Sequence, residues 1–220
     1  MDAALIFFII ECVGVVAYSV SAAIIAIDHK VDLFGVLLLT VITTFGGGMT
    51  RDFLLGNTPP LAFREPAYWV LIVISVATAL AVFVIARILQ QRFSENEERI
   101  ERIDNIFDAL ALGVFATSGA RVVMEYAGGL YEKNWFLVIT LAMLTAAGGG
   151  MIRDVMLGRV PLVLRKRIYA IAAIAGAISY YILVRLSAPQ NVAIIVGSAV
   201  TFVLRMCATY FKWNLPKAIE

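Results

Sequence analysis

Long apolar runs separated by short polar segments make up most of the chain. A helix needs about 20 apolar residues to cross a bilayer, and seven runs are close to this length. We expect membrane-spanning helices at residues 4–27, 33–57, 66–90, 105–126, 134–158, 168–186 and 192–211. The pattern therefore predicts an all-α membrane protein with seven transmembrane helices.

The composition agrees with this prediction. Of the 220 residues, 61% are hydrophobic and only 15% are charged, whereas soluble domains are about 45–50% apolar. The first residues lack the basic segment of a signal peptide, so we expect the first span to be retained. The net charge of +2 gives no reason to expect a nucleic-acid partner.

One glycine-rich motif occurs twice. The first copy runs from Gly46 to Gly56 and is followed by Pro59, and the second runs from Gly148 to Gly158 and is followed by Pro161. From Gly46 to Gly148 and from Pro59 to Pro161 the offset is the same 102 residues. Both copies read G-G-G-M-x-R-D-x-x-L-G, which indicates an internal duplication.

The duplication extends beyond the motif. Glu11 and Ser21 in the first span match Asp108 and Ser118 in the fourth, at an offset of 97 residues. Each repeat then holds three spans, and because three is odd the repeats must have opposite topology, which gives an inverted-repeat architecture. The expected division is residues 1–90 for the first repeat, 91–104 for a polar cytoplasmic connector, 105–186 for the second repeat, and 187–220 for the seventh helix and tail.

Lysine and arginine predict the orientation, because cytoplasmic loops are enriched in them. One side collects Lys30, Arg87, Arg92, Arg99, Arg102, Arg159, Arg165, Lys166, Arg167, Lys212 and Lys217. The other side holds Arg64, Lys133 and Arg185, with Arg121 near it. The N-terminus is then outside and the C-terminus cytoplasmic.

The glycine runs predict breaks in the second and fifth helices, because each glycine costs about 1 kcal/mol in a helix relative to alanine. A half-helix ends in free carbonyls with partial negative charge, which attract cations. We expect a monovalent cation near these carbonyls, with hydroxyls from Thr43 and Thr145 beside them. The predicted kink and pore-lining residues are Gly46, Gly47, Gly48, Gly148, Gly149, Gly150, Thr43 and Thr145. The alternative is that the glycines only allow close helix packing.

Six of the charged residues inside apolar spans, where charge is expensive, are candidates for a polar path or for structural pairs. They are Glu11, Arg51, Asp52, Asp108, Arg153 and Asp154. Neighbours along a helix do not face each other. The helical rise of about 1.5 Å per residue places Glu11 and Asp108 each at the same membrane depth as the arginine of its own repeat. We therefore expect Glu11 near Arg51 and Asp108 near Arg153; the rival is pairing between repeats, as in Arg51 with Asp154. The charges either line a pore or only lock the fold.

No enzyme motif is present: there is no nucleophile elbow, phosphate loop or dinucleotide fingerprint. The residues alone leave two main hypotheses. The first is a cation channel with a continuous water path, and the second is a secondary transporter of a small zwitterion such as glycine. A structural membrane subunit is a weaker third.

The doubled motif G-G-G-x-x-R-D-x-x-L-G-x-x-P in seven spans resembles the prokaryotic homologues of the trimeric intracellular cation (TRIC) channels, over essentially the whole chain. The same family is also described as having glycine-transporter members. The resemblance implies a homotrimer in the prokaryotic plasma membrane, with one pore per protomer lined by kinked helices two and five. It implies potassium or sodium as permeant ions and copies of the chain as partners. We also expect membrane lipid as a partner, no nucleic acid and no cofactor.

Overall fold

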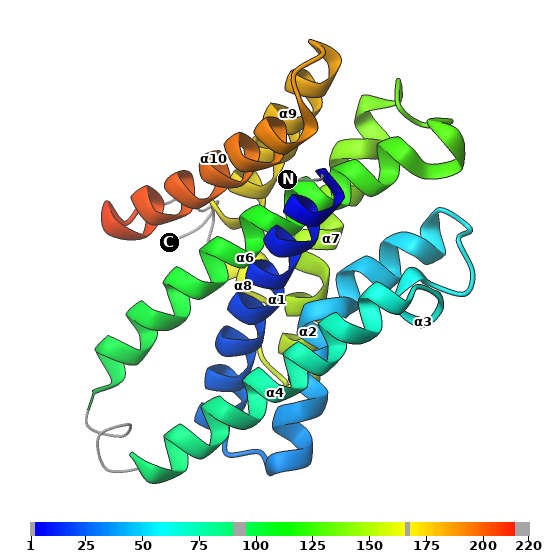
Figure 1. Ribbon diagram of the computed structural model, residues 1–220. Helices are drawn as coiled ribbons and strands as arrows, with labels where there is room; N and C mark the ends of the chain where they lie inside the picture. The colour runs from blue at the N-terminus through cyan, green and yellow to red at the C-terminus, as the bar shows by residue number, and fades with distance from the viewer. Residues whose placement is uncertain (1–2, 90–95, 166–167, 214–220) are drawn as a thin grey trace.

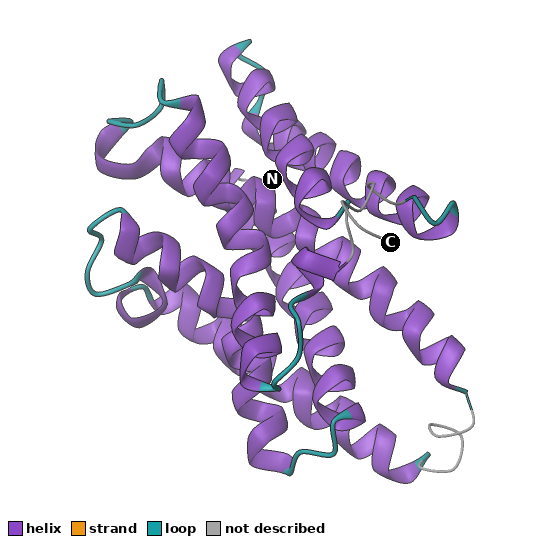
Figure 2. Cartoon of the chain, turned by 180° about the vertical axis from the view of Figure 1, so that it is seen from behind, coloured by secondary structure: helices purple, strands orange, loops and turns teal. Residues whose placement is uncertain are grey.

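The computed structural model of the chain describes residues 3–89, 96–165 and 168–213. Its long helices are α1 (Ala3–Asp28), α2 (Leu33–Leu54), α4 (Pro66–Ile88), α6 (Glu97–Glu125), α7 (Trp135–Met156), α9 (Tyr169–Arg185) and α10 (Gln190–Tyr210). Short turns α3 (Leu61–Arg64), η1 (Tyr126–Gly128) and α8 (Leu162–Arg165) lie between them. Within the described residues the chain is helix and loop, without strands (Figure 2).

The seven long helices match the seven expected spans. Six of them are long and apolar enough to cross a membrane, and α9, with 17 residues, is a shorter apolar helix. At about 1.5 Å per residue α9 is about 26 Å long, slightly less than the hydrocarbon core. The prediction of an all-α, multi-span protein is therefore confirmed.

Local capping sets several helix ends. The Asp32 carboxylate accepts a hydrogen bond from the Gly35 amide at 2.8 Å, and the Asn134 side chain accepts one from the Leu137 amide at 3.1 Å. Each satisfies an amide that the first helical turn leaves free. Pro66 occupies the start of α4, where its missing N–H costs nothing.

The described part of the polar connector is helical. Residues 97–104 are the first turns of α6, so the fourth span and most of the connector form one helix. The reason is that its charged residues are good helix formers, and the Arg102–Glu98 pair at 3.5 Å supports one exposed face. The predicted connector residues 91–95, the basic Lys166 and Arg167, and the tail residues 214–220 lie outside the described residues.

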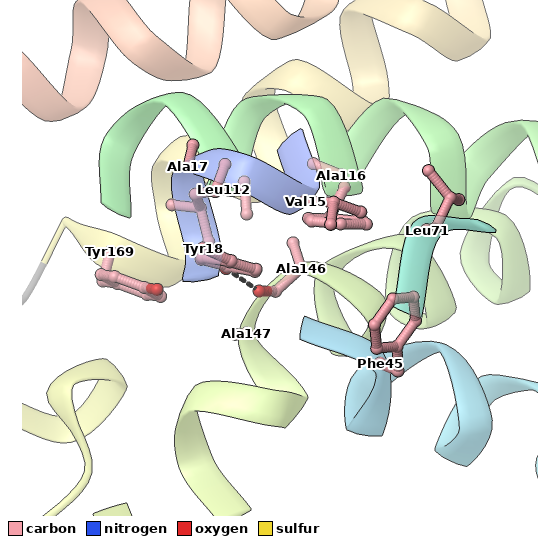
Figure 3. Packing of buried hydrophobic residues seen from close by; sticks show 13 residues of the cluster. Val15, Ala17, Tyr18, Phe45, Leu71, Leu112, Ala116, Ala146, Ala147 and Tyr169 are labelled. Atoms are coloured by element: carbon pink, nitrogen blue, oxygen red, sulfur yellow. Dashed lines mark hydrogen bonds between the residues drawn. The ribbon is translucent and has the colours of Figure 1, made fainter. Parts of the chain in front are cut away.

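α1 runs through the middle of the molecule between α4 and α6, and α2 lies along α7 (Figure 1). α9 and α10 pack on each other and on α6, away from α4. The core where these helices meet is built from small residues such as Ala111, Ala116 and Ala146, with a few large side chains between them (Figure 3). Small residues let helix backbones approach closely, which is how helices associate in a bilayer.

Candidate functional site

The glycine runs do not break their helices. α2 is continuous α-helix from Leu33 to Leu54 and α7 from Trp135 to Met156, through both runs. The expected unwinding at the glycines is therefore not seen, because leaving backbone groups unpaired in a membrane costs more free energy than the low helix propensity of glycine. The Gly46 carbonyl, expected to be free, also accepts a hydrogen bond from the Thr50 hydroxyl at 2.8 Å.

The glycines instead bring the two helix backbones together. A methyl carbon added at Gly47 would collide with the Thr145 carbonyl, and one added at Gly149 would collide with the Thr43 carbonyl. A carbon added at Gly148 would lie 3.1 Å from the Gly47 Cα. These contacts exchange with each other when the offset of 102 residues is applied, as contacts across a twofold axis do. The two glycine runs thus meet at one crossing of α2 and α7.

Thr43 and Thr145 lie at the crossing of α2 and α7. Their hydroxyls donate to carbonyls of their own helices, to Leu39 at 2.6 Å and to Leu141 at 2.7 Å. Their own carbonyls face the glycine of the other helix. These two threonines therefore mark the crossing point itself, and the hydroxyl protons are already used.

Each motif arginine pairs with the aspartate that follows it. Arg51 donates to the Asp52 carboxylate through Nε at 3.0 Å and Nη2 at 2.8 Å. Nε and Nη2 of Arg153 each lie 2.9 Å from the Asp154 carboxylate. All four side chains are buried. Sequence neighbours diverge at Cα, but a long arginine side chain can turn back to meet the carboxylate, so the pairing lies within each motif rather than between repeats.

The same aspartates also fix the turn that follows. The second carboxylate oxygen of Asp52 accepts from the Leu61 amide at 2.9 Å, and that of Asp154 accepts from the Leu162 amide at 2.8 Å. These amides begin the short helices α3 and α8. Each Arg-Asp pair therefore holds its own span and the next short helix in one unit.

The final glycine of each motif ends its helix. Gly56 has φ of +71° and Gly158 has φ of +68°, values that favour glycine. The amide of each bonds the carbonyl three residues before it at 3.0 Å, and the following amide bonds the aspartate carbonyl at 2.9 Å. This is the Schellman arrangement, and it explains why the motif continues to L-G-x-x-P.

Glu11 lies near Arg51 but does not form its ion pair. Its carboxylate accepts from the Ser118 hydroxyl at 2.7 Å, across the two repeats. Glu11 and Arg51 line one cavity of about 20 Å³, enough for about one water. The cavity is bordered by Glu11, Thr44, Arg51, Tyr68, Ser118 and Thr145.

Asp108 has partners that the sequence analysis did not identify. It accepts from the Tyr169 hydroxyl at 2.9 Å and lies 3.5 Å from Nη2 of Arg205 on α10. It is also within electrostatic range of Arg153, but the ion pair is with Arg205. The signal for Arg205 was available, because it is a charged residue inside the seventh apolar run.

Solved structures similar to this chain include TRIC channels. The structure described as the structural basis for conductance through TRIC cation channels is 38% identical, covers 96% of this chain and 97% of its own, and superposes with a TM-score of 0.80. A prokaryotic TRIC channel in 0.5 M KCl is 33% identical with a TM-score of 0.81, covering 96% of this chain and 99% of its own. A family model described as "Glycine transporter" matches residues 8–87 and 105–185. The chain belongs to the TRIC family.

The match to the TRIC family covers both halves of the duplication. The two matched segments coincide with the two predicted three-helix repeats, while α10 lies outside them. UPF0126 membrane protein YvgT of Bacillus subtilis is 32% identical over 94% of both chains. A UPF0126 membrane protein of Deinococcus radiodurans is 38% identical over 79% of this chain and 74% of its own. These TRIC relatives are channels and membrane proteins, and the chain is not an enzyme.

Proposed function

We propose that the chain is a monovalent cation channel that passes potassium or sodium, with one pore in each protomer along α2 and α7. One observation carries this proposal: 30–38% identity to prokaryotic TRIC channels over at least 94% of the chain, with TM-scores of 0.79–0.81. So close a likeness over the whole chain favours a shared mode of action as well as a shared fold.

The charges around the crossing suit a cation. The positive charges of Arg51 and Arg153 are each neutralised by a carboxylate within 3.0 Å, so they do not repel a passing cation as a free arginine would. Glu11 adds a carboxylate to the cavity beside Arg51, and the Ser118 hydroxyl next to Glu11 supplies a further oxygen. Oxygen-rich walls of this kind replace the water around a potassium or sodium ion.

Conduction requires the crossing to open. A cavity of about 20 Å³ holds about one water, which is too little for a hydrated ion. We propose that α2 and α7 bend or separate at Gly46–Gly48 and Gly148–Gly150, and that the carbonyls released there coordinate the ion. Glycine permits this at low cost because it has no side chain to restrict its backbone.

The remaining parts of the proposal concern assembly and membrane position. The reciprocal contacts at Gly47 and Gly149 support two repeats of inverted topology. The names of the similar structures support a homotrimer, and a relative in Escherichia coli is an inner membrane protein, which supports the plasma membrane. The lysine and arginine distribution supports an external N-terminus and a cytoplasmic C-terminus.

The family description "Glycine transporter" keeps a carrier of a small zwitterion as the competing function. Purified protein in planar bilayers with symmetric potassium chloride separates the two. A channel gives unitary current steps that grow linearly with voltage. Saturable glycine uptake into liposomes, without unitary steps, would replace the channel with the carrier.

A further inference from the structure

The duplication creates two equivalent polar sites, which are completed differently. The first-repeat site holds Glu11 and Tyr68, and the second-repeat site holds their counterparts Asp108 and Tyr169. At the first-repeat site the Glu11 carboxylate accepts from Ser118 and borders the cavity. At the second-repeat site the Asp108 carboxylate accepts from Tyr169 and faces a cationic side chain. The two ends of the proposed path are therefore chemically unlike.

The cationic side chain comes from the helix that the duplication does not contain. Arg205 lies on α10, outside the matched repeats. Its guanidinium carbon is 4.8 Å from the centre of the Tyr169 ring, and Nη2 is 3.5 Å from the Asp108 carboxylate. Because α10 is present once, it supplies a cation to one of the two sites.

Arg205 is buried but incompletely bonded. It is 2% exposed, and its Nε has no hydrogen-bond partner. Its contact with Asp108, at 3.5 Å, is longer than the 2.7–2.9 Å of a strong charge-assisted hydrogen bond. A guanidinium has five donors, and buried donors are almost always bonded. The hydrogen bonding of Arg205 is therefore incomplete for a buried guanidinium.

A hydrogen bond to a backbone carbonyl is a second difference at the second-repeat site. The Tyr18 hydroxyl donates to the Ala146 carbonyl, two residues before the second glycine run (Figure 3). The counterpart of Tyr18 in the other repeat is Phe115, which stacks on the Tyr18 ring with centroids 5.2 Å apart and has no hydroxyl. The second-repeat site therefore carries a capped carbonyl as well as an occupied carboxylate.

We infer that Arg205 is a tethered cation that occupies the second-repeat site in place of a permeant ion, and that conduction requires α10 to withdraw it from Asp108. This inference rests on the proposed channel function. Arg205 is then a positioning residue that reaches the path from outside the repeats, and α10 controls one end of the path.

The test compares unitary currents and potassium efflux from liposomes for wild type, Arg205→Gln and Arg205→Lys. Arg205→Gln removes the tethered charge and leaves the Asp108 carboxylate open to potassium, so we expect efflux to rise about tenfold, because a fixed unit charge a few ångströms away changes local cation occupancy by at least that factor. Arg205→Lys keeps a positive charge and should return efflux toward the wild-type value. Arg185→Gln is the matched control, since Arg185 pairs with Glu132 at 2.7 Å on the exposed surface, and it should conduct like wild type.

A double variant keeps the inference testable if Arg205→Gln fails to fold. Asp108→Asn with Arg205→Gln leaves no stranded charge. It removes the blocking cation but also the carboxylate that would bind potassium, so it should conduct more than wild type and less than Arg205→Gln. If either folded variant conducts as wild type does, or if only stability changes, Arg205 is a structural anchor and the inference is overturned. A wild-type protein without unitary currents would instead refute the proposed channel function, so the two failures are distinguishable.

Discussion

The alanine variants Gly149→Ala and Gly150→Ala differ by one position but should have opposite effects on stability. A methyl carbon at position 149 would collide with the Thr43 carbonyl oxygen and lie 2.7 Å from its carbon. At position 150 the nearest atom is Nη2 of Arg153 at 3.6 Å, an ordinary contact at the end of a flexible side chain. Both substitutions make the same change in helix propensity, so they isolate the crossing of α2 and α7.

The expected magnitudes follow from these contacts. Alanine gains about 1 kcal/mol over glycine in a helix interior, so Gly150→Ala should stabilise the protein by up to about that amount. Relieving the collision with the Thr43 carbonyl oxygen at position 149 would push the backbones of α2 and α7 apart, because both partners of the clash are fixed to the backbone. Overpacking of this kind costs about 1–3 kcal/mol, and because the propensity gain is common to both variants, we expect their stabilities to differ by about 1–3 kcal/mol.

Unfolding in mixed micelles with rising sodium dodecyl sulfate, followed by far-ultraviolet circular dichroism, measures this difference. Gly149→Ala should unfold at lower detergent than wild type and Gly150→Ala at the same or higher detergent. Equal midpoints for the two variants would show that the glycines are not a close-packed crossing. The counterpart pair Gly47→Ala and Gly48→Ala should repeat the result, because its contacts are reciprocal.

Two further substitutions test the rest of the motif. Asp154→Asn removes the carboxylate that pairs with Arg153 at 2.9 Å and Arg159 at 3.1 Å, and stranding buried charge should cost about 3–5 kcal/mol; an unchanged thermal midpoint would argue against the pairing. Gly158→Ala adds a side chain where φ is +68° and no atom lies within 4 Å, so the loss should be the conformational cost of about 1–2 kcal/mol, measured in the same unfolding assay, and a stabilised variant would contradict the assigned turn.

The span pattern could be predicted because it depends on local hydrophobicity and length. The ends of α2 and α7 followed from the motif, where the apolar run stops near Gly56 and Gly158. The continuous helix through the glycines could not be predicted from propensity alone. It depends on a close contact between α2 and α7, which are far apart in sequence. The packing at this contact offsets the free-energy cost of glycine in a helix.

The partners of the buried charges also depend on contacts between helices that the sequence alone does not specify. Depth placed Glu11 beside Arg51, and both line one cavity, but depth does not say which carboxylate an arginine reaches. The rule that helical neighbours diverge applies to short side chains better than to arginine at a helix end. Arg205 could not be paired by comparing the two repeats, because α10 has no counterpart in the duplication.

The reversal potential of the wild-type protein tests the central claim most directly. With a tenfold potassium chloride gradient across a planar bilayer, a cation-selective channel should show unitary currents that reverse near the potassium equilibrium potential, about 59 mV from zero for a monovalent ion. Reversal near zero or on the chloride side, or the absence of unitary currents, would contradict a cation channel.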